Sequence, residues 1–285
     1  MNPTQECPVC GQPSRKQMVH PDGYIFRCME CTHAFTDPSS PAQETYDEGY
    51  FLETHRNWFL NPNTALFRRI QHMLRPEDCR EGLLDVGCGR GDLLFHLEKS
   101  NPALSLAGID IAPLPAHPQI HFVSRDLFDW EPDRPYSVVT SLAVIEHVAD
   151  IRGFLGKLRR FVKKGGRLVI MTLNEDGVLY AIARGVLKLG FHGPFERLYS
   201  RHHRHHFTRR SLRSLVEISE FQVLDHYTHN FPLAAVDFPS RGFWMDSSQK
   251  AGVAALFGLG GIFPKRLPAD NSLQSIAGNC PKIPI

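Results

Sequence analysis

Four cysteines near the N-terminus have the type and spacing of a metal site. Cys7 and Cys10 form one C-x2-C pair, and Cys28 and Cys31 form a second pair after an interval of seventeen residues. Tetrahedral zinc takes four thiolates, and each pair can present two sulfurs from a tight turn. Two disulfides or four free thiols are the alternatives, but a reducing cytoplasm disfavours disulfides. We therefore expect a zinc ribbon at residues 1–40 that holds a structural Zn²⁺ without an open coordination position.

A glycine-rich turn is the second group of residues with a chemical use. The apolar run 83–86 predicts a strand that contains Asp85. The turn that follows has glycine at three alternate positions, Gly87, Gly89 and Gly91. Glycines let a ligand approach the backbone closely. The next predicted strand, 104–111, ends near Asp110, and a carboxylate at that edge of a parallel sheet suits the hydroxyls of a ribose.

The order of the acid and the glycines distinguishes two kinds of nucleotide site. A glycine-rich turn can also belong to a dinucleotide-binding site, so the glycines alone are weak evidence. The dinucleotide fingerprint has a further glycine, however, and Leu93 and Leu94 stand in its place here. The stretch 83–91 instead resembles the first motif of the class I S-adenosylmethionine-dependent methyltransferases. The resemblance implies that the three glycines lie beneath the methionine part of the cofactor S-adenosylmethionine. It also implies that Asp85 orders the amino-acid end of the cofactor and that Asp110 holds its ribose.

Two later segments resemble the same family and follow in its order. A third predicted strand, 121–124, precedes Asp126 and Leu127, and the resemblance implies that this acid lies near the adenine amino group. A fourth predicted strand, 136–143, leads into Ile145-Glu146-His147-Val148. That ending is similar to one branch of the family, which includes quinone-biosynthesis methyltransferases. The N-terminal cysteines are similar to those of members with a zinc ribbon in glycan and lipid pathways.

Histidines are the candidate catalytic residues. His147 follows the fourth predicted strand, and four more histidines lie in the segment 201–208. By alignment with the family, His203 and His205 match polar positions that face the acceptor. An oxygen or carbon acceptor must lose a proton before it attacks the methyl group, and imidazole titrates near neutral pH. A solvated basic loop, hydrogen bonds to the backbone and a second metal site are the alternative interpretations of these histidines.

The elements that position these residues alternate from residue 81 onward, because short apolar runs follow helical stretches. Such alternation is typical of a parallel sheet covered by helices on both faces. Together with the resemblance, it predicts an α/β, Rossmann-like, doubly wound and mostly parallel seven-stranded sheet with an antiparallel last strand. The predicted organisation has a zinc ribbon at 1–40, a linker with helices at 41–80 and a methyltransferase domain at 81–285, with substrate-side insertions at 174–207 and 230–270.

Three local patterns refine this prediction. Three prolines between residues 112 and 118 preclude the helix that the family has there. A turn at 163–166 precedes the fifth predicted strand, 167–173. An amphipathic helix at 209–219 has Thr208, or a residue beside it, as its N-terminal cap.

Composition narrows the classes of function without choosing a substrate. The chain has 285 residues, with 32 basic and 30 acidic side chains and a formal net charge of +2. No strong uniform field therefore favours nucleic acid or anionic lipid as the partner. No apolar run approaches the roughly 20 residues that span a bilayer, so we expect a cytoplasmic protein without a transmembrane segment. Peripheral contact with a membrane remains compatible with the sequence.

These observations predict a methyltransferase that uses S-adenosylmethionine to methylate a small-molecule, glycan or lipid-precursor acceptor. One alternative is a ribosomal RNA methyltransferase with a zinc knuckle, although no dense basic stripe flanks the cysteines. Another alternative is a protein that binds the cofactor, or a partner, without turnover. The intact glycine turn disfavours that alternative.

Overall fold

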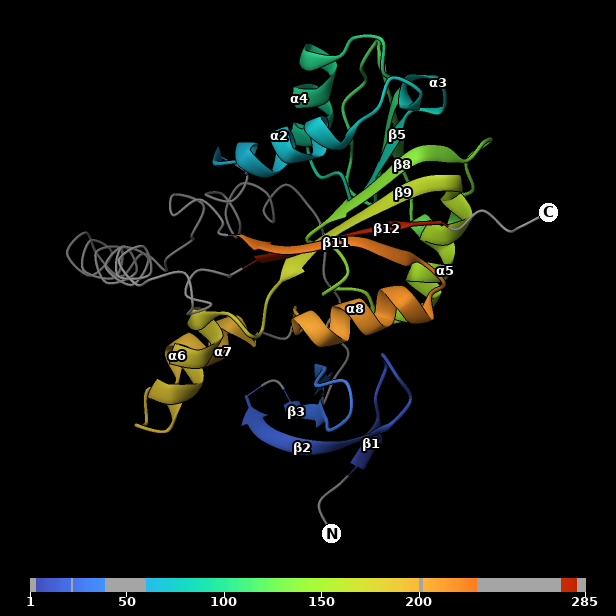
Figure 1. The fold of residues 1–285 in the computed structure, drawn as a ribbon. Coiled ribbons are helices and arrows are strands. Elements are labelled where there is room, and N and C mark those ends of the chain that lie inside the picture. Colours follow the sequence, from blue (N-terminus) through green and yellow to red (C-terminus); the bar gives the residue numbers. More distant parts are fainter. Residues whose placement is uncertain (1–3, 22, 39–59, 200–201, 230–272, 281–285) are drawn as a thin grey trace.

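The computed structural model describes residues 4–21, 23–38, 60–199, 202–229 and 273–280, and these residues form two sheets (Figure 1). The predicted insertion at 230–270 and residues 41–59 of the predicted linker lie outside the described residues. The larger sheet carries the glycine turn. The smaller sheet contains the four N-terminal cysteines, and we call residues 4–38 the cysteine ribbon.

The larger sheet has seven strands in the order β11-β12-β9-β8-β5-β6-β7. β12 is antiparallel to β9 and β11, whereas the pairs from β9 to β7 are parallel. The predicted fold class is therefore confirmed, including the antiparallel strand that is last in the chain. The strands are β5 (Leu83–Val86), β6 (Leu106–Asp110), β7 (Ile120–Ser124), β8 (Tyr136–Leu142), β9 (Val162–Leu173), β11 (Gln222–His229) and β12 (Leu273–Asn279).

Helices cover both faces of this sheet because successive strand residues point to opposite sides. Leu83 packs with α2 and α4 on one face, and Leu84 packs with α5 and α8 on the other. None of the helices in the described part of the chain is long and apolar enough to cross a bilayer. The helices are α2 (Thr64–Met73), α3 (Asp78–Glu81), α4 (Asp92–Ser100), α5 (Ile151–Phe161), α6 (Val178–Leu187), α7 (Gly193–Leu198) and α8 (Arg209–Ile218).

Two of the three local predictions agree with the structure and one does not. No helix joins β6 to β7, as the three prolines require. Thr208 caps α8 by accepting from the Ser211 amide, and the Ser211 hydroxyl accepts from the Thr208 amide in return. The turn predicted at 163–166 is instead part of β9, which begins at Val162. Gly165 allows this extension because its φ of 72° is open to glycine without strain.

The cysteine ribbon is completed by a strand from the other end of the chain. Its sheet has the order β1-β2-β3-β4-β10, with all pairs antiparallel. β10 contains only His205–His206 and pairs with β4. The smaller sheet therefore takes its edge strand β10 from the part of the chain between α7 and α8. The ribbon strands are β1 (Thr4–Glu6), β2 (Pro13–His20), β3 (Gly23–Cys28) and β4 (Ala34–Pro38).

The cysteine ribbon packs directly on the α5 and α8 side of the larger sheet (Figure 1). Its buried Val9 lies in the same apolar cluster as Ile151 and Phe207. The Arg152 guanidinium donates to the Val9 carbonyl at 3.0 Å, and the hydroxyls of Thr32 and Thr208 lie 2.7 Å apart. The apolar core is thus continuous between the two sheets, which makes the ribbon part of one packed body.

A buried carboxylate adds an ionic tie between the same parts. Glu175 follows β9 and is 2% exposed. It accepts from the Arg27 guanidinium of β3, from Arg184 of α6 at 2.6 Å and from the Tyr199 hydroxyl beside α7. Burial and this carboxylate raise the pKa of Tyr199. One side chain therefore joins the cysteine ribbon, the large sheet and the α6–α7 pair.

The replacement Glu175→Gln should lower the free energy of unfolding by about 2–3 kcal/mol, because it removes the buried carboxylate that pairs with the partly buried guanidinium groups of Arg27 and Arg184. Chemical denaturation measures this change. Asp225→Asn is the matched control: it breaks the Arg69–Asp225 pair, whose side chains are about half exposed, and should cost under about 1 kcal/mol. Equal costs for the two variants would contradict the role given to Glu175.

Candidate active site and metal centre

The glycine turn is held by the carboxylate at the end of the neighbouring strand. Gly87, Gly89 and Gly91 have φ values of 71°, 54° and 84°, which favour glycine. The Gly89 amide donates to Asp110 Oδ2 at 2.8 Å, and the Ala112 amide donates to Asp110 Oδ1 at 3.0 Å. Each oxygen keeps a second lone pair for a ligand. Asp110 therefore both shapes the turn and presents its carboxylate at the edge of the sheet.

At two of these positions, Gly87 and Gly91, close packing excludes any side chain, in addition to the positive φ that favours glycine. A Cβ at Gly87 would lie 2.2 Å from Val144 Cγ2, and a Cβ at Gly91 would lie 2.8 Å from the Phe122 ring. Val144 follows Ala143, whose φ of 57° is strained for a residue with a side chain. The loop after β8 is thereby pressed against the glycine turn. A cradle of backbone with little side-chain volume results, which fits a ligand bound along the turn.

Asp85 lies in β5 beneath this turn and is 3% exposed. The Thr140 hydroxyl donates to Asp85 Oδ1 at 2.6 Å. Burial raises the pKa of Asp85 to about 7, and the nearby negative charge of Asp110 acts in the same direction. A cationic group bound above β5 would favour the ionised carboxylate. This environment fits the ammonium end of an amino acid.

Asp126, which is predicted to lie near the adenine, stands two residues after the end of β7. Asp126 precedes the short 3₁₀ helix η2 (Leu127–Asp129) and accepts from the Phe128 amide at 2.8 Å. Leu127 itself is buried. Sequence reasoning missed two apolar side chains at the same edge, Ile111 after β6 and Phe128 after β7, which are 52% and 49% exposed. Ile111 follows Asp110 directly and Phe128 stands two residues after Asp126, and this spacing is the signal that could have marked them as apolar groups beside a candidate binding edge.

The structure brings two of the predicted histidines together. The rings of His147 and His203 lie edge to face with centroids 5.0 Å apart. His147 Nδ1 lies 2.9 Å from the His202 carbonyl oxygen, so in the neutral ring Nδ1 carries the proton and Nε2 is the accepting nitrogen. The amides of Arg204 and His205 donate to the Glu146 carbonyl at 2.8 and 3.1 Å. These bonds fix the histidine segment to the loop after β8.

His205 lies elsewhere, which differs from its expected place facing the acceptor. Its Nδ1 is 3.1 Å from Nε2 of His33 in the cysteine ribbon, and the two rings stack. Burial lowers the pKa of His205 to about 4. The physical reason is the pairing of β10 with β4, which turns this ring into the interface between the sheets. His205 therefore packs the ribbon against the large sheet and does not join His147 and His203.

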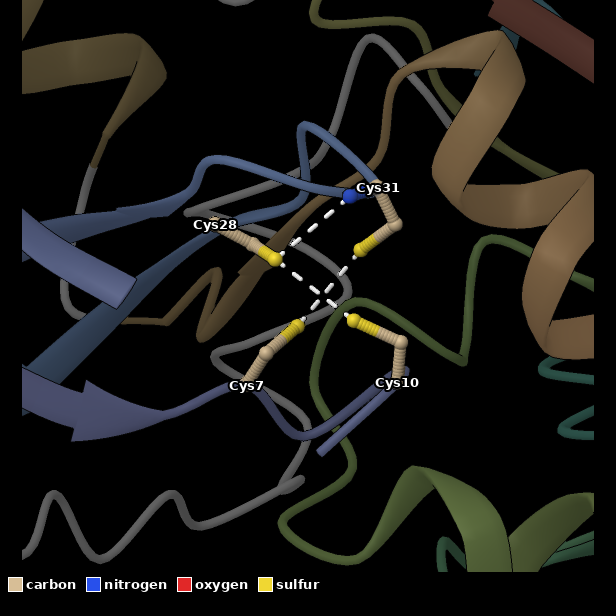
Figure 2. Close-up of side chains that lie close together, drawn as sticks. All are labelled: Cys7, Cys10, Cys28 and Cys31. Carbon is tan, nitrogen blue, oxygen red and sulfur yellow. Dashed lines mark hydrogen bonds between the residues drawn. The ribbon is translucent and has the colours of Figure 1, made fainter. Parts of the chain in front are cut away.

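The four N-terminal cysteines converge as the spacing predicts (Figure 2). Their Sγ atoms all lie within 4.8 Å of one another, with Cys7 and Cys31 3.6 Å apart and Cys10 and Cys28 3.5 Å apart. Four thiolates at about 2.3 Å from one ion would be separated by similar distances, so the cluster fits tetrahedral zinc. The Cys31 amide also donates to Cys28 Sγ at 3.5 Å, as a backbone donor to a liganding sulfur would.

The close contact of the thiols shifts the pKa values of the paired cysteines in opposite directions. The hydrogen bond with Cys31 lowers the pKa of Cys7 to about 5, whereas the same contact and burial raise the pKa of Cys31. Burial also raises the pKa of Cys10. Without a cation only part of the cluster can therefore ionise, and a bound Zn²⁺ would stabilise all four thiolates.

The part of the chain that follows the cysteine ribbon is similar to known proteins. Residues 52–226, more than half of the chain, match the family described as a methyltransferase domain. The ubiquinone biosynthesis O-methyltransferase of Bradyrhizobium sp. (strain ORS 278) is 30% identical over 129 residues, which cover 42% of this chain and 51% of that protein. The protein of the same name from Rhodopseudomonas palustris (strain HaA2) is 28% identical over 173 residues, covering 51% and 68%. The match therefore spans about half the length of the first relative.

Solved structures share the fold at low sequence identity. A chain of the Haloferax volcanii complex that contains the Trm112 methyltransferase activator has a TM-score of 0.57 at 13% identity, covering 84% of this chain and 100% of that one. The Burkholderia thailandensis 1,6-didemethyltoxoflavin-N1-methyltransferase, solved with its substrate and S-adenosylhomocysteine, has a TM-score of 0.50 at 12% identity, covering 90% and 99%. These likenesses show the fold alone.

The replacement Gly87→Ala should destabilise the protein by about 1–3 kcal/mol, because its Cβ meets Val144 and its φ is strained. Gly156→Ala is the matched control: Gly156 lies within α5 with nothing in reach of an added Cβ, so alanine there should stabilise by about 0.5–1 kcal/mol. Urea denaturation of both variants measures the difference. The proposed turn geometry fails if Gly87→Ala is as stable as the wild type.

The replacement Cys10→Ser should reduce bound zinc from about one ion per chain to well below that level, because three thiolates remain. Elemental analysis of the purified protein measures the metal. Cys79→Ser is the control, since Cys79 lies outside the cluster and contacts Asn101. Full zinc content in Cys10→Ser would contradict a four-thiolate site.

Proposed function

Because the chain belongs to the methyltransferase-domain family, we propose that it transfers the methyl group of S-adenosylmethionine to an oxygen of a small-molecule or lipid-precursor acceptor. The observation that carries this proposal is the glycine turn closed by Asp110, whose two oxygens hold the Gly89 and Ala112 amides at the sheet edge. The names of the relatives, O-methyltransferases of ubiquinone biosynthesis, favour oxygen as the acceptor atom.

In this proposal, different residues along the sheet edge contact different parts of the cofactor. When bound, S-adenosylmethionine supplies an electrophilic methyl group on a sulfonium. The glycines would lie under its methionine part, Asp85 would order the ammonium end and Asp110 would bind the ribose hydroxyls. Asp126, Leu127, Ile111 and Phe128 would surround the adenine, with the two exposed apolar side chains against its faces.

His147 and His203 are the groups that we assign to the acceptor. A hydroxyl must give up its proton as its oxygen attacks the methyl carbon, and a neutral imidazole nitrogen can accept that proton. His147 presents Nε2 for this purpose because Nδ1 is engaged with the His202 carbonyl. His203 stands against its ring and would orient the acceptor or share the proton. His205 has no such role in this proposal, since its ring is bonded to His33.

Zinc in the cysteine ribbon is structural in this proposal. All four thiols point at one another, so no coordination position is left for a substrate. The metal would hold the two C-x2-C turns together and keep the ribbon docked on α5 and α8. Its loss should therefore unfold the ribbon before the large sheet.

The replacement Asp110→Asn should weaken the binding of S-adenosylmethionine about tenfold or more, because an amide cannot accept from both backbone N–H groups and also bind the ribose. Isothermal calorimetry measures the affinity. Asp133→Asn is the matched control, because Asp133 is exposed and precedes β8, at the opposite edge of the sheet.

Formation of S-adenosylhomocysteine with a panel of phenolic acceptors, short and polyprenylated, tests the transfer itself. His147→Gln should lower kcat and leave cofactor affinity unchanged. Absence of S-adenosylmethionine binding by folded, zinc-loaded protein would overturn the proposed function, and unchanged affinity in Asp110→Asn would overturn the ribose assignment.

A further inference from the structure

We infer that Thr36, a residue of the cysteine ribbon, is a positioning residue for the acceptor-side histidine His203. The inference rests on the proposed methyl transfer, and it assigns the ribbon a share in arranging the active site. Thr36 belongs to β4 and touches neither the glycine turn nor Asp110 in the contacts of the described residues. Its effect would pass through the segment 202–206.

Thr36 is bonded to this segment at three residues, His203, Arg204 and His206. Its amide donates to the Arg204 carbonyl at 2.9 Å. Its hydroxyl lies 3.0 Å from His206 Nε2 and 3.5 Å from the His203 carbonyl oxygen. Thr36 is 5% exposed, so these bonds do not compete with bulk water. The side chain and the backbone of Thr36 thus fix the backbone positions of the residues on both sides of Arg204.

The opposite side of the same segment is bonded to the large sheet. The Glu146 carbonyl accepts from the Arg204 and His205 amides. Glu146 is itself fixed, because its buried carboxylate accepts from the Thr172 hydroxyl at 2.8 Å. The segment is therefore clamped between β4 of the ribbon and the loop after β8. His203 directly precedes the bonded residue Arg204, and its ring contacts the ring of His147.

The hydroxyl of Thr36 matters beyond the backbone pairing. His206 is 1% exposed and packs against the rings of Tyr199 and Tyr180, at centroid distances of 4.5 and 6.3 Å. Its Nδ1 has no hydrogen-bond partner among the described residues, so Thr36 supplies the bond that orients this ring. Without the hydroxyl, His206 would have to turn or admit water. Either change would shift the backbone that places His203.

Displacement of a reacting group by about 1 Å can cost on the order of a hundredfold in rate. A shift in the backbone position of residues 202–206 should therefore lower kcat and leave the cofactor site intact. This pattern separates positioning from stability, because general unfolding would lower the active fraction and the amount of bound cofactor together.

The test compares Thr36→Val with Thr36→Ser in the full-length, zinc-loaded protein. Valine keeps the shape of threonine and removes the hydroxyl, whereas serine keeps the hydroxyl. We expect Thr36→Val to lower kcat about five- to tenfold with unchanged KM and affinity for S-adenosylmethionine, and Thr36→Ser to stay within about twofold of the wild type. Thr4→Val, on the exposed edge strand β1, is the control within the same ribbon.

Two further measurements keep the test decisive. The imidazole nitrogen signals of His203 and His206 in NMR spectra should shift in Thr36→Val and return in Thr36→Ser, which needs no acceptor substrate. His206→Phe retains the packing against the tyrosines and removes the partner of Thr36, so it should reproduce the loss of kcat if Thr36→Val does not fold.

Wild-type kcat and unshifted His203 signals in Thr36→Val would overturn the inference, and so would a serine variant as impaired as the valine variant. Failure of the wild type to methylate any acceptor would count against the proposed function instead. The histidine signals would still decide whether Thr36 positions the segment.

Discussion

The structure depends on one short length of backbone that is bonded in two directions. Residues 204 and 205 donate their amides to the Glu146 carbonyl in the loop after β8, while the Arg204 carbonyl accepts from Thr36 of the ribbon. Each bond satisfies a polar group that would otherwise be costly to bury. Because β10 is the edge strand of the ribbon sheet and its backbone is bonded to the loop after β8, its position fixes how the ribbon sits on α5 and α8, and it also fixes where His203 meets His147.

The same interface combines several kinds of interaction, and each supports the others. The apolar cluster joins Val9 to Ile151 and Phe207, and Glu175 neutralises guanidinium groups from both sides. A buried carboxylate of this kind is costly unless every partner is in place, so the network favours one docked arrangement. The cysteine cluster lies at the edge of this core. Metal binding would therefore stabilise the surface on which the histidine segment rests.

The sequence predicted the elements whose signals are local. The alternation of apolar runs and helices located β5 to β9, the spacing of the cysteines located their cluster, and the prolines at 112–118 excluded a helix. The glycines could be predicted because all three have positive φ values, and because Val144 crowds Gly87 and Phe122 crowds Gly91. The docking of the ribbon on the large sheet could not be predicted, because β10 consists of only two histidines and has no alternation of apolar residues that would mark it as a strand. For the same reason His205 was expected beside the acceptor, and the joining of Glu175 to Arg27 across 148 residues left no pattern in the sequence.

Hydrogen exchange at single amides tests most directly whether the docked ribbon holds this segment in place on the large sheet. The Thr36 amide of the ribbon donates to the Arg204 carbonyl, and the amides of Arg204 and His205 donate to the Glu146 carbonyl, so their protection reports on both sides of the segment. In zinc-loaded protein we expect these amides to exchange slowly, and removal of the metal by a chelator should expose all three while β5 and β8 stay protected. Unchanged protection of Arg204 and His205 after the ribbon has lost its metal and unfolded would contradict the account.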